Sequence, residues 1–462
     1  MAGYQLRPVP GGWFEDLLRS RVLIPFLAAG LATIAAAPVR GQEIIEQAPI
    51  HYSTATPRNV ISQLTERLGE GKAKLQFEPG FGYLRSLLKE LDIPVSSQVL
   101  VFSKTSLQRD RISPRTPRAI YFNDDVMIGF CKRGSVIEIT APDEVVGTAF
   151  YTIHQGLDDD EGEERPAPKG VPQRQTESCL TCHASSANRG YPGSLVRSLY
   201  VDRQGEPIFS MGSFHTDHDS PLAERWGGWY VTGTSGDQKH LGNVTNRGDE
   251  SEGDAKKDDG VNVVDLKGRF ATSAYLSPHS DIVALMVLEH QVGMLNRLAR
   301  AGLETRMALH YQHEMNKALG LPPEERSDSA WSRIRNVGDA AVRYMLFRDE
   351  TRLTGKVEGT STFAADFARR GPRDAKGRSL RDLDLNARLF RYPVSYLIYS
   401  KAFETLPAEV KDHIYQRLWD ILNGRGGKDD PKLGDDDRVA IVEILRETKP
   451  DLPPYWKATA DR

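Results

Sequence analysis

The chain of 462 residues predicts an α+β fold, in which a β-containing N-terminal half is followed by an α-helical C-terminal half. Two observations favour this class. Short runs of β-branched and aromatic residues alternate with turn residues between residues 97 and 154. From Ser280 onward, apolar residues recur at the three- and four-residue spacing of helices. A net charge of -3 gives no basic field of the kind that attracts nucleic acid, so we expect no nucleic-acid partner.

The N-terminus has the pattern of an export signal. Arg19 and Arg21 precede an uncharged, mainly apolar run over residues 22–39, and small and polar residues follow it. We expect residues 1–41 to be a signal peptide. An uncleaved membrane anchor is the alternative, because the run is near the lower length limit for spanning a bilayer. Either reading predicts a periplasmic or otherwise exported bacterial protein, whose only membrane contact would be this anchor.

Helices and then a small antiparallel sheet are expected after the export segment. Leucines at helical spacing predict two helical pieces within residues 60–91, separated by Gly80 and Gly82 and ended by Pro94. The expected strands, each bounded by turn residues, cover residues 99–102, 119–122, 127–130, 136–139 and 145–153.

A Cys-Leu-Thr-Cys-His motif follows at residues 179–183, and this spacing is the attachment signature of c-type haem. Thiols three residues apart on one helical turn face the same way, so Cys179 and Cys182 can each add to a haem vinyl group. His183 is then held under the iron as an axial ligand. A redox dithiol needs no such histidine, and structural zinc needs two more ligands. The motif predicts one covalent haem c, with the remaining Cys131 as a buried hydrophobe.

At this motif the chain resembles the c-type cytochromes. The resemblance covers little more than the five residues of the motif. It implies covalent haem and a proximal His183, and with them electron transfer. It does not imply the small-cytochrome fold or its methionine ligand, since strands are predicted here where that fold has helices.

Beyond the motif, the pattern predicts a hairpin from residues 195–201 and 207–210 and a strand within residues 226–231. A helix N-capped by Ser280 is expected over residues 281–319, broken near Gly302. Residues 355–377 are expected to form a loop, and later helices to cover residues 329–347, 407–422 and 438–447. The expected domains are a haem-bearing α+β domain over residues 42–265 and an α-helical domain over residues 266–462.

The ligand on the other face of the iron decides the function, because a second strong ligand gives an electron carrier and an open position allows catalysis. Histidines are concentrated after the motif, although the whole chain holds only 11. The candidates for the sixth ligand are His240, His218, His215 and Met211, followed by His154 and His290. The helical pattern around His290 favours a buried core histidine.

An arginine can hold a haem propionate in bidentate fashion, which makes Arg225 and Arg197 candidates. Trp226 and Trp229 are candidates for packing at the porphyrin edge. Ordinary salt bridges and core packing remain open as alternative roles for these residues.

The predicted function is that of an exported mono-haem c-type cytochrome that exchanges electrons with an unidentified redox partner protein. The alternative is a haem-dependent oxidoreductase, peroxidase-like or handling small oxides, with an open iron position. A single attachment motif favours the first, because enzymes that store two oxidising equivalents on haem c often carry two haems. The length of the chain favours a role beyond simple electron shuttling.

Overall fold

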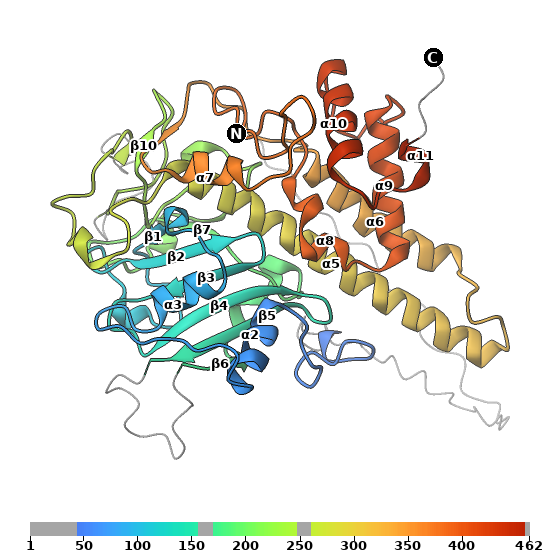
Figure 1. Ribbon diagram of the computed structural model, residues 1–462, viewed down its shortest axis with the longest axis horizontal. Helices are drawn as coiled ribbons and strands as arrows, with labels where there is room; N and C mark the ends of the chain where they lie inside the picture. Colours follow the sequence, from blue (N-terminus) through green and yellow to red (C-terminus); the bar gives the residue numbers. More distant parts are fainter. Residues whose placement is uncertain (1–43, 156–169, 247–259, 458–462) are drawn as a thin grey trace, which may run out of the picture. The chain divides into compact units, whose positions relative to one another are not determined.

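An antiparallel sheet organises the N-terminal half of the molecule (Figure 1). The computed structural model describes residues 44–155, 170–246 and 260–457, so the predicted export segment lies outside the described residues. Within this part of the chain the sheet has the strand order β6-β5-β4-β3-β2-β1-β9. The strands are β1 (Val99–Val101), β2 (Arg118–Asn123), β3 (Val126–Phe130), β4 (Val136–Asp143), β5 (Gly147–His154), β6 (Pro172–Gln175) and β9 (Trp229–Tyr230).

Side-chain turns explain where the central strands end. Asn123 Oδ1 accepts the N–H groups of Asp125 and Val126, each at 3.1 Å, and this turn joins β2 to β3. Asp143 Oδ1 accepts two N–H groups in the same way, and Gly147 then adopts a φ of 79° that few other residues tolerate. The predicted strand over residues 145–153 therefore begins two residues later than expected.

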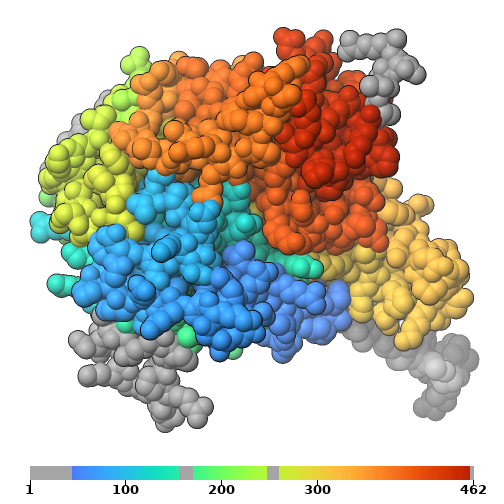
Figure 2. All heavy atoms as spheres, viewed as in Figure 1, coloured from blue at the N-terminus to red at the C-terminus, as the bar shows by residue number. Residues whose placement is uncertain are grey.

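The two faces of the sheet pack against different helices. One face, including Tyr121, Ile139 and Ile153, shares a core with α2 (Val60–Gly69) and α3 (Leu84–Glu90). The blue N-terminal segment that carries α2 and α3 covers much of this side of the molecule (Figure 2). The opposite face contributes side chains such as Val99, Val101 and Phe122 to the core around the long helix α5.

Helix α5 (Ile282–Leu319) is a continuous helix of 38 residues that runs between the sheet and the other helices (Figure 1). The expected break at Gly302 is absent from it. Its N-cap is Asp281 and not Ser280 as predicted. Ser280 is used by the sheet instead, since its Oγ donates to Tyr230 O at 2.6 Å and accepts the N–H of Leu100 at 2.9 Å.

The C-terminal half is helical, as predicted, and α6 and α9 pack along α5 and each other. The helices of this half are α6 (Asp328–Met345), α7 (Phe363–Arg369), α8 (Lys401–Glu404), α9 (Ala408–Leu422), α10 (Asp435–Thr448) and α11 (Pro454–Lys457). The expected loop over residues 355–377 was wrong in part, because it contains α7 and the short strand β11 (Glu358–Gly359).

Two pairings differ from the expected hairpin after the motif. Strand β7 (Arg197–Leu199) pairs with β8 (Ser213–His215), and the nearer segment contributes only an isolated bridge between Val201 and Pro207. Strand β10 (Gly233–Thr234) pairs with β11 from the helical half. The described residues on both sides of the predicted domain boundary belong to one compact unit.

Candidate functional site

The Cys-Leu-Thr-Cys-His motif forms a single helical turn, α4 (Leu180–His183), that begins directly after Cys179. Leu180 is buried in the same core as α2 and α3 and anchors the turn. Both thiols are free, with Cys179 half-buried and Cys182 exposed. Burial raises the pKa of Cys179 to about 11, so this thiol is protonated at neutral pH. The turn therefore holds two reduced thiols three residues apart, as covalent haem attachment requires.

The imidazole of His183 is fixed by a single backbone acceptor. Its Nδ1 lies 2.9 Å from Gly193 O, and its ring packs on that of Phe150 with a centroid separation of 4.7 Å. Burial lowers the pKa of His183, which favours the neutral ring. A neutral ring that donates from Nδ1 carries its lone pair on Nε2. This is the tautomer that binds a metal.

The loop that supplies Gly193 is held by helix α5. Asn296 Oδ1 accepts the N–H of Ser194 at 3.0 Å, and its Nδ2 donates to Ser194 O at 2.8 Å and to Asn188 Oδ1 at 3.1 Å. A Cβ atom at position 193 would lie 2.4 Å from Asn296 Oδ1, so only glycine fits there. Helix α5 thus determines where the acceptor for His183 lies.

An ion pair that the sequence did not reveal lies close to the motif. Arg118 of β2 and Glu138 of β4 are 2.6 Å apart, and both side chains are largely buried. A Cβ atom on the intervening strand at Gly129 would lie 2.1 Å from Arg118 Nη2. The two charges oppose each other at both motif residues, because Glu138 raises the pKa values of Cys179 and His183 and Arg118 lowers them. The signal that could have found it is a pair of opposite charges at same-face positions of the two strands that flank β3, with a glycine between them.

The candidates for the sixth ligand occupy different environments. His215 is exposed on β8 opposite Arg197, and Met211 is buried against Tyr200 and Leu241. His240 is buried, and its Nδ1 accepts the N–H of Gly242 at 3.1 Å. Burial lowers the pKa of His240 to about 4, so its ring is neutral. None of these residues shares a hydrogen bond or ring contact with His183 within residues 44–155, 170–246 and 260–457.

His218 is engaged by other protein atoms. Its Nδ1 lies 2.8 Å from His290 Nδ1, and its Nε2 lies 2.8 Å from Asp219 Oδ1. Nδ1 is therefore engaged by His290, whereas Nε2 and Asp219 Oδ1 approach each other at ion-pair distance without hydrogen-bond geometry. His290 is fully buried, as its helical pattern indicated, but the sequence did not predict that the two histidines would meet.

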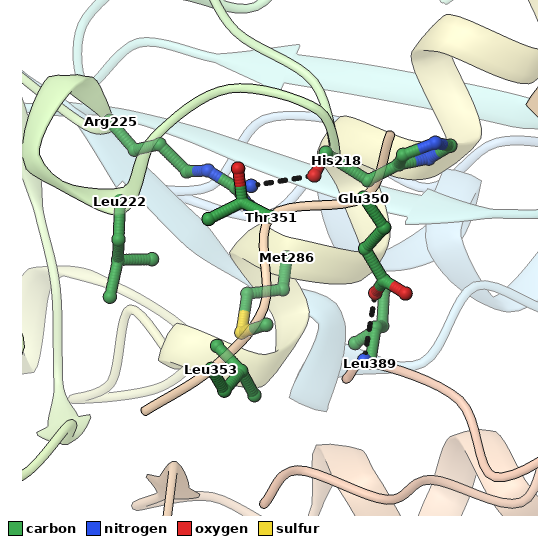
Figure 3. Close-up of a pocket in the computed structure, with 8 residues that line it drawn as sticks. All are labelled: His218, Leu222, Arg225, Met286, Glu350, Thr351, Leu353 and Leu389. Atoms are coloured by element: carbon green, nitrogen blue, oxygen red, sulfur yellow. Dashed lines mark hydrogen bonds between the residues drawn. The ribbon is translucent and has the colours of Figure 1, made fainter. Parts of the chain in front are cut away.

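Arg225 and Trp226 also lie inside the protein. Arg225 is buried beside Glu289, with Nη1 3.1 Å from Glu289 Oε2, and its Nη2 donates to His218 O at 2.9 Å. Together with Glu350 and several apolar residues it lines a small cavity (Figure 3). Arg225 is thus already paired inside the protein, and its expected contact with a propionate stays a prediction. Trp226 is fully buried with a φ of 68° and packs edge-on against His240.

Within the described residues, no group of three or more histidine, cysteine or acidic side chains is arranged to hold a metal ion. Among the described helices, none is both long and apolar enough to cross a membrane. Comparisons with models of protein families, with curated proteins and with solved structures find no match to this chain.

Proposed function

We propose that the chain is an exported mono-haem c-type cytochrome that transfers electrons to or from a redox partner protein. Haem c would be attached through Cys179 and Cys182, with His183 Nε2 as an axial ligand. The observation that carries the proposal is the environment of His183. Its Nδ1 is tied to Gly193 O beside two free thiols on one helical turn, which leaves the Nε2 lone pair as the ligating position.

The residues around the motif would orient and tune the ligand. A histidine that donates its other N–H to a backbone carbonyl keeps one tautomer and one ring orientation, and its ligating nitrogen becomes more basic. The Gly193 carbonyl supplies that acceptor, and Asn296 holds the loop in place. When bound, haem supplies one-electron chemistry between ferric and ferrous iron. The Arg118–Glu138 pair next to the motif brings no net charge, so burial and ligation would dominate the reduction potential.

The second candidate function is a haem-dependent oxidoreductase with an open iron position. One observation favours it. His218 Nδ1 is engaged by His290, its Nε2 lies 2.8 Å from Asp219, and Met211 is packed in a small apolar cluster, so His215 and His240 are the less encumbered of the four ligand candidates. If neither reaches the iron, the sixth position would be open or held weakly.

Haem attachment is tested by expressing the full chain with a haem c maturation system. We expect one covalent haem per chain, seen as haem stain on a denaturing gel and as the matching mass increase. Cys179→Ala with Cys182→Ala should abolish the stain, whereas Cys131→Ala, at a buried position outside the motif, should retain it. Stain that persists in the double variant, or is missing from the wild type, would refute the proposal.

Optical spectra distinguish the two functions. Sharp low-spin bands that carbon monoxide does not change after reduction would mean two protein ligands and an electron carrier. His215→Ala and His240→Ala, made separately, should then identify the ligand, because only one of them should lose the low-spin spectrum. A high-spin ferric form that binds carbon monoxide on reduction would favour the oxidoreductase.

A further inference from the structure

The buried imidazoles of His218 and His290 are part of a polar network that neither haem attachment nor the proposed function uses. His218 Nδ1 and His290 Nδ1 lie 2.8 Å apart, and both side chains are at most 2% exposed. At one end, His218 Nε2 lies 2.8 Å from Asp219 Oδ1, whose side chain is 36% exposed. At the other end, His290 Nε2 lies 2.7 Å from the Oγ of the buried Ser395. The polar network therefore extends from the partly exposed Asp219 to the buried Ser395.

The contacts within this polar network can form both when the two imidazoles are neutral and when they share one added proton. In the neutral pair, Ser395 Oγ donates to His290 Nε2 and His290 Nδ1 donates to His218 Nδ1. The Nε2–H of His218 faces Asp219 Oδ1 at 2.8 Å, an ion-pair distance without hydrogen-bond geometry. After one proton is added, a single proton still lies between the two Nδ1 atoms. His290 Nε2 then donates to Ser395 Oγ, and only the serine hydroxyl has to rotate. No contact is lost when one proton is bound, whereas a second proton would put two N–H groups against each other.

Charged and aromatic groups enclose the pair. Tyr344 of α6 stacks on His218 with ring centroids 4.0 Å apart, and Phe347 stacks on His290 at 4.3 Å. The Arg297 guanidinium lies 3.6 Å from the centre of the Tyr344 ring and 3.6 Å from Asp217. The other ionisable groups around the pair are Asp219, Arg225, Glu289 and Glu350.

At neutral pH both imidazoles of the pair are uncharged. Burial lowers the pKa of both His218 and His290, and the Arg297 charge acts in the same direction. Asp219 and Asp217 oppose this effect at His218. A buried neutral site with a carboxylate at its outer end accepts a proton when negative charge arrives nearby.

Helix α5 connects the pair to the haem-attachment segment. Asn296, which holds the loop of Gly193, lies six residues after His290 on this helix. Six residues of α-helix span roughly 9 Å. The path from the pair to His183 runs along α5 to Asn296 and then through the loop of Gly193, and it lies in protein interior, where charges are screened less than in water.

We propose that His218 and His290 form a buried proton-binding pair that takes up one proton, through Asp219, when the haem is reduced. The coupling to haem rests on the proposed function, whereas the proton-binding pair itself does not. The step is balanced: one electron would pass from the redox partner to the haem, and one proton would enter the pair from solvent at the Asp219 end. The position between the two Nδ1 atoms holds one proton before and after, and the added N–H is at His290 Nε2, facing Ser395 Oγ.

The pair is tested first by following the ring ¹⁵N signals of histidine-labelled protein through a pH titration, with or without haem. We expect His218 and His290 to move together in a single step that has its midpoint below pH 6.5. Asp219→Asn should lower the midpoint by about one pH unit, since it removes the charge that faces the added proton. Ser395→Ala should also lower the midpoint. His310→Gln, which lies on α5 like His290, should leave the midpoint unchanged. Rings that titrate separately, or remain neutral until the protein unfolds, would overturn the proposal.

The coupling is tested by measuring the reduction potential of the haem-loaded protein between pH 4 and 8. Uptake of one proton per electron makes the potential fall by about 59 mV per pH unit within the coupled range. Asp219→Asn should move this range to lower pH. His290→Gln should remove the part of the slope below pH 6.5 and leave only that of the buried Glu289 and Glu350, whose pKa values burial raises to about 7. A slope that is the same in all variants, or absent from the wild type, would overturn the coupling. Failure to bind haem would refute the proposed function instead, and the nitrogen signals would still decide whether the pair exists.

Discussion

Asn296 in helix α5 holds Ser194 through two backbone hydrogen bonds, one accepted by Oδ1 at 3.0 Å and one donated by Nδ2 at 2.8 Å. The residue before Ser194 supplies the carbonyl that fixes the ring of His183. A side chain far along the sequence therefore sets the geometry of the motif. This relationship joins the helical half of the chain to the predicted haem site.

Asn296→Ala should loosen this loop. It removes three hydrogen bonds and leaves backbone groups of Ser194 without partners, which should lower the free energy of unfolding by about 1–3 kcal/mol. Urea denaturation measures the loss, and Asn386→Ala, at an exposed asparagine, is the matched control. In haem-loaded protein the same variant should perturb the spectrum, because the tautomer of His183 is no longer fixed. An unchanged stability would mean that the loop is held by other contacts.

Asp281 combines a helix cap with a contact to the helical half. Its Oδ1 accepts the N–H of Val283 at 2.8 Å, and its Oδ2 accepts both the N–H and the hydroxyl of Ser361. Asp281→Ala should cost about 2–3 kcal/mol, since an N-cap contributes about 1 kcal/mol and the loss of buried partners adds to it. Thermal or urea unfolding checks this value. Asp435→Ala, in the exposed first turn of α10, should change stability by less than about 0.5 kcal/mol.

Local patterns were sufficient to predict most of the elements. The periodicity of apolar residues in the sequence predicts the strands and the helices, and turn residues such as Asn123 mark where strands end. The α+β class and the order of its two halves are confirmed. The errors fall where distant contacts decide the outcome. Ser280 appeared to be the helix cap, but the sheet uses its hydroxyl, and the pairing of β7 with β8 skips the nearer segment.

The motif itself could be read from spacing alone, because its thiols and imidazole are adjacent in the sequence. The partners that orient it could not. Asn296 lies more than a hundred residues away, and nothing in its neighbourhood distinguishes it from a surface asparagine. The pairing of His218 with His290 is equally invisible, since it depends on how the loop after β8 packs on α5. Haem attachment and the identity of the sixth ligand stay predictions.

The buried pair of Arg225 and Glu289 should respond strongly to the loss of one partner. Arg225→Met leaves Glu289, which has 0% exposed side chain, without its cation, and should cost about 3–5 kcal/mol at about pH 8. The cost should shrink at lower pH, because burial raises the pKa of Glu289 to about 7 and a protonated carboxyl needs no cation. Arg225→Met combined with Glu289→Leu should recover part of this loss, because no uncompensated charge remains buried. A double-mutant cycle from urea denaturation measures the coupling. Equal losses in the single and double variants would show that the arginine acts mainly through its bonds to His218 and Ser220 carbonyls.

Glu350, which lines the cavity beside His218, should make stability depend on pH. Burial raises the pKa of Glu350 from 4.5 to about 7 in the folded protein. Between these values the folded state binds a proton that the unfolded state does not, so the contribution of Glu350 is greatest below pH 4.5 and is lost as the pH rises through 7. Glu350→Gln does not titrate and still offers an oxygen to the N–H of Leu389, which lies 2.9 Å from Glu350 Oε1 in the wild type (Figure 3).

The difference in unfolding free energy between wild type and Glu350→Gln should therefore fall from pH 4.5 to 7, by at most about 3 kcal/mol, and then level off. Urea denaturation of both proteins across this range, without haem, provides the measurement. Glu314→Gln, at an exposed position of α5, should give a difference that does not vary with pH. A flat profile for Glu350→Gln as well would mean that the carboxylate stays ionised in the cavity, stabilised there by Arg225 and Arg388.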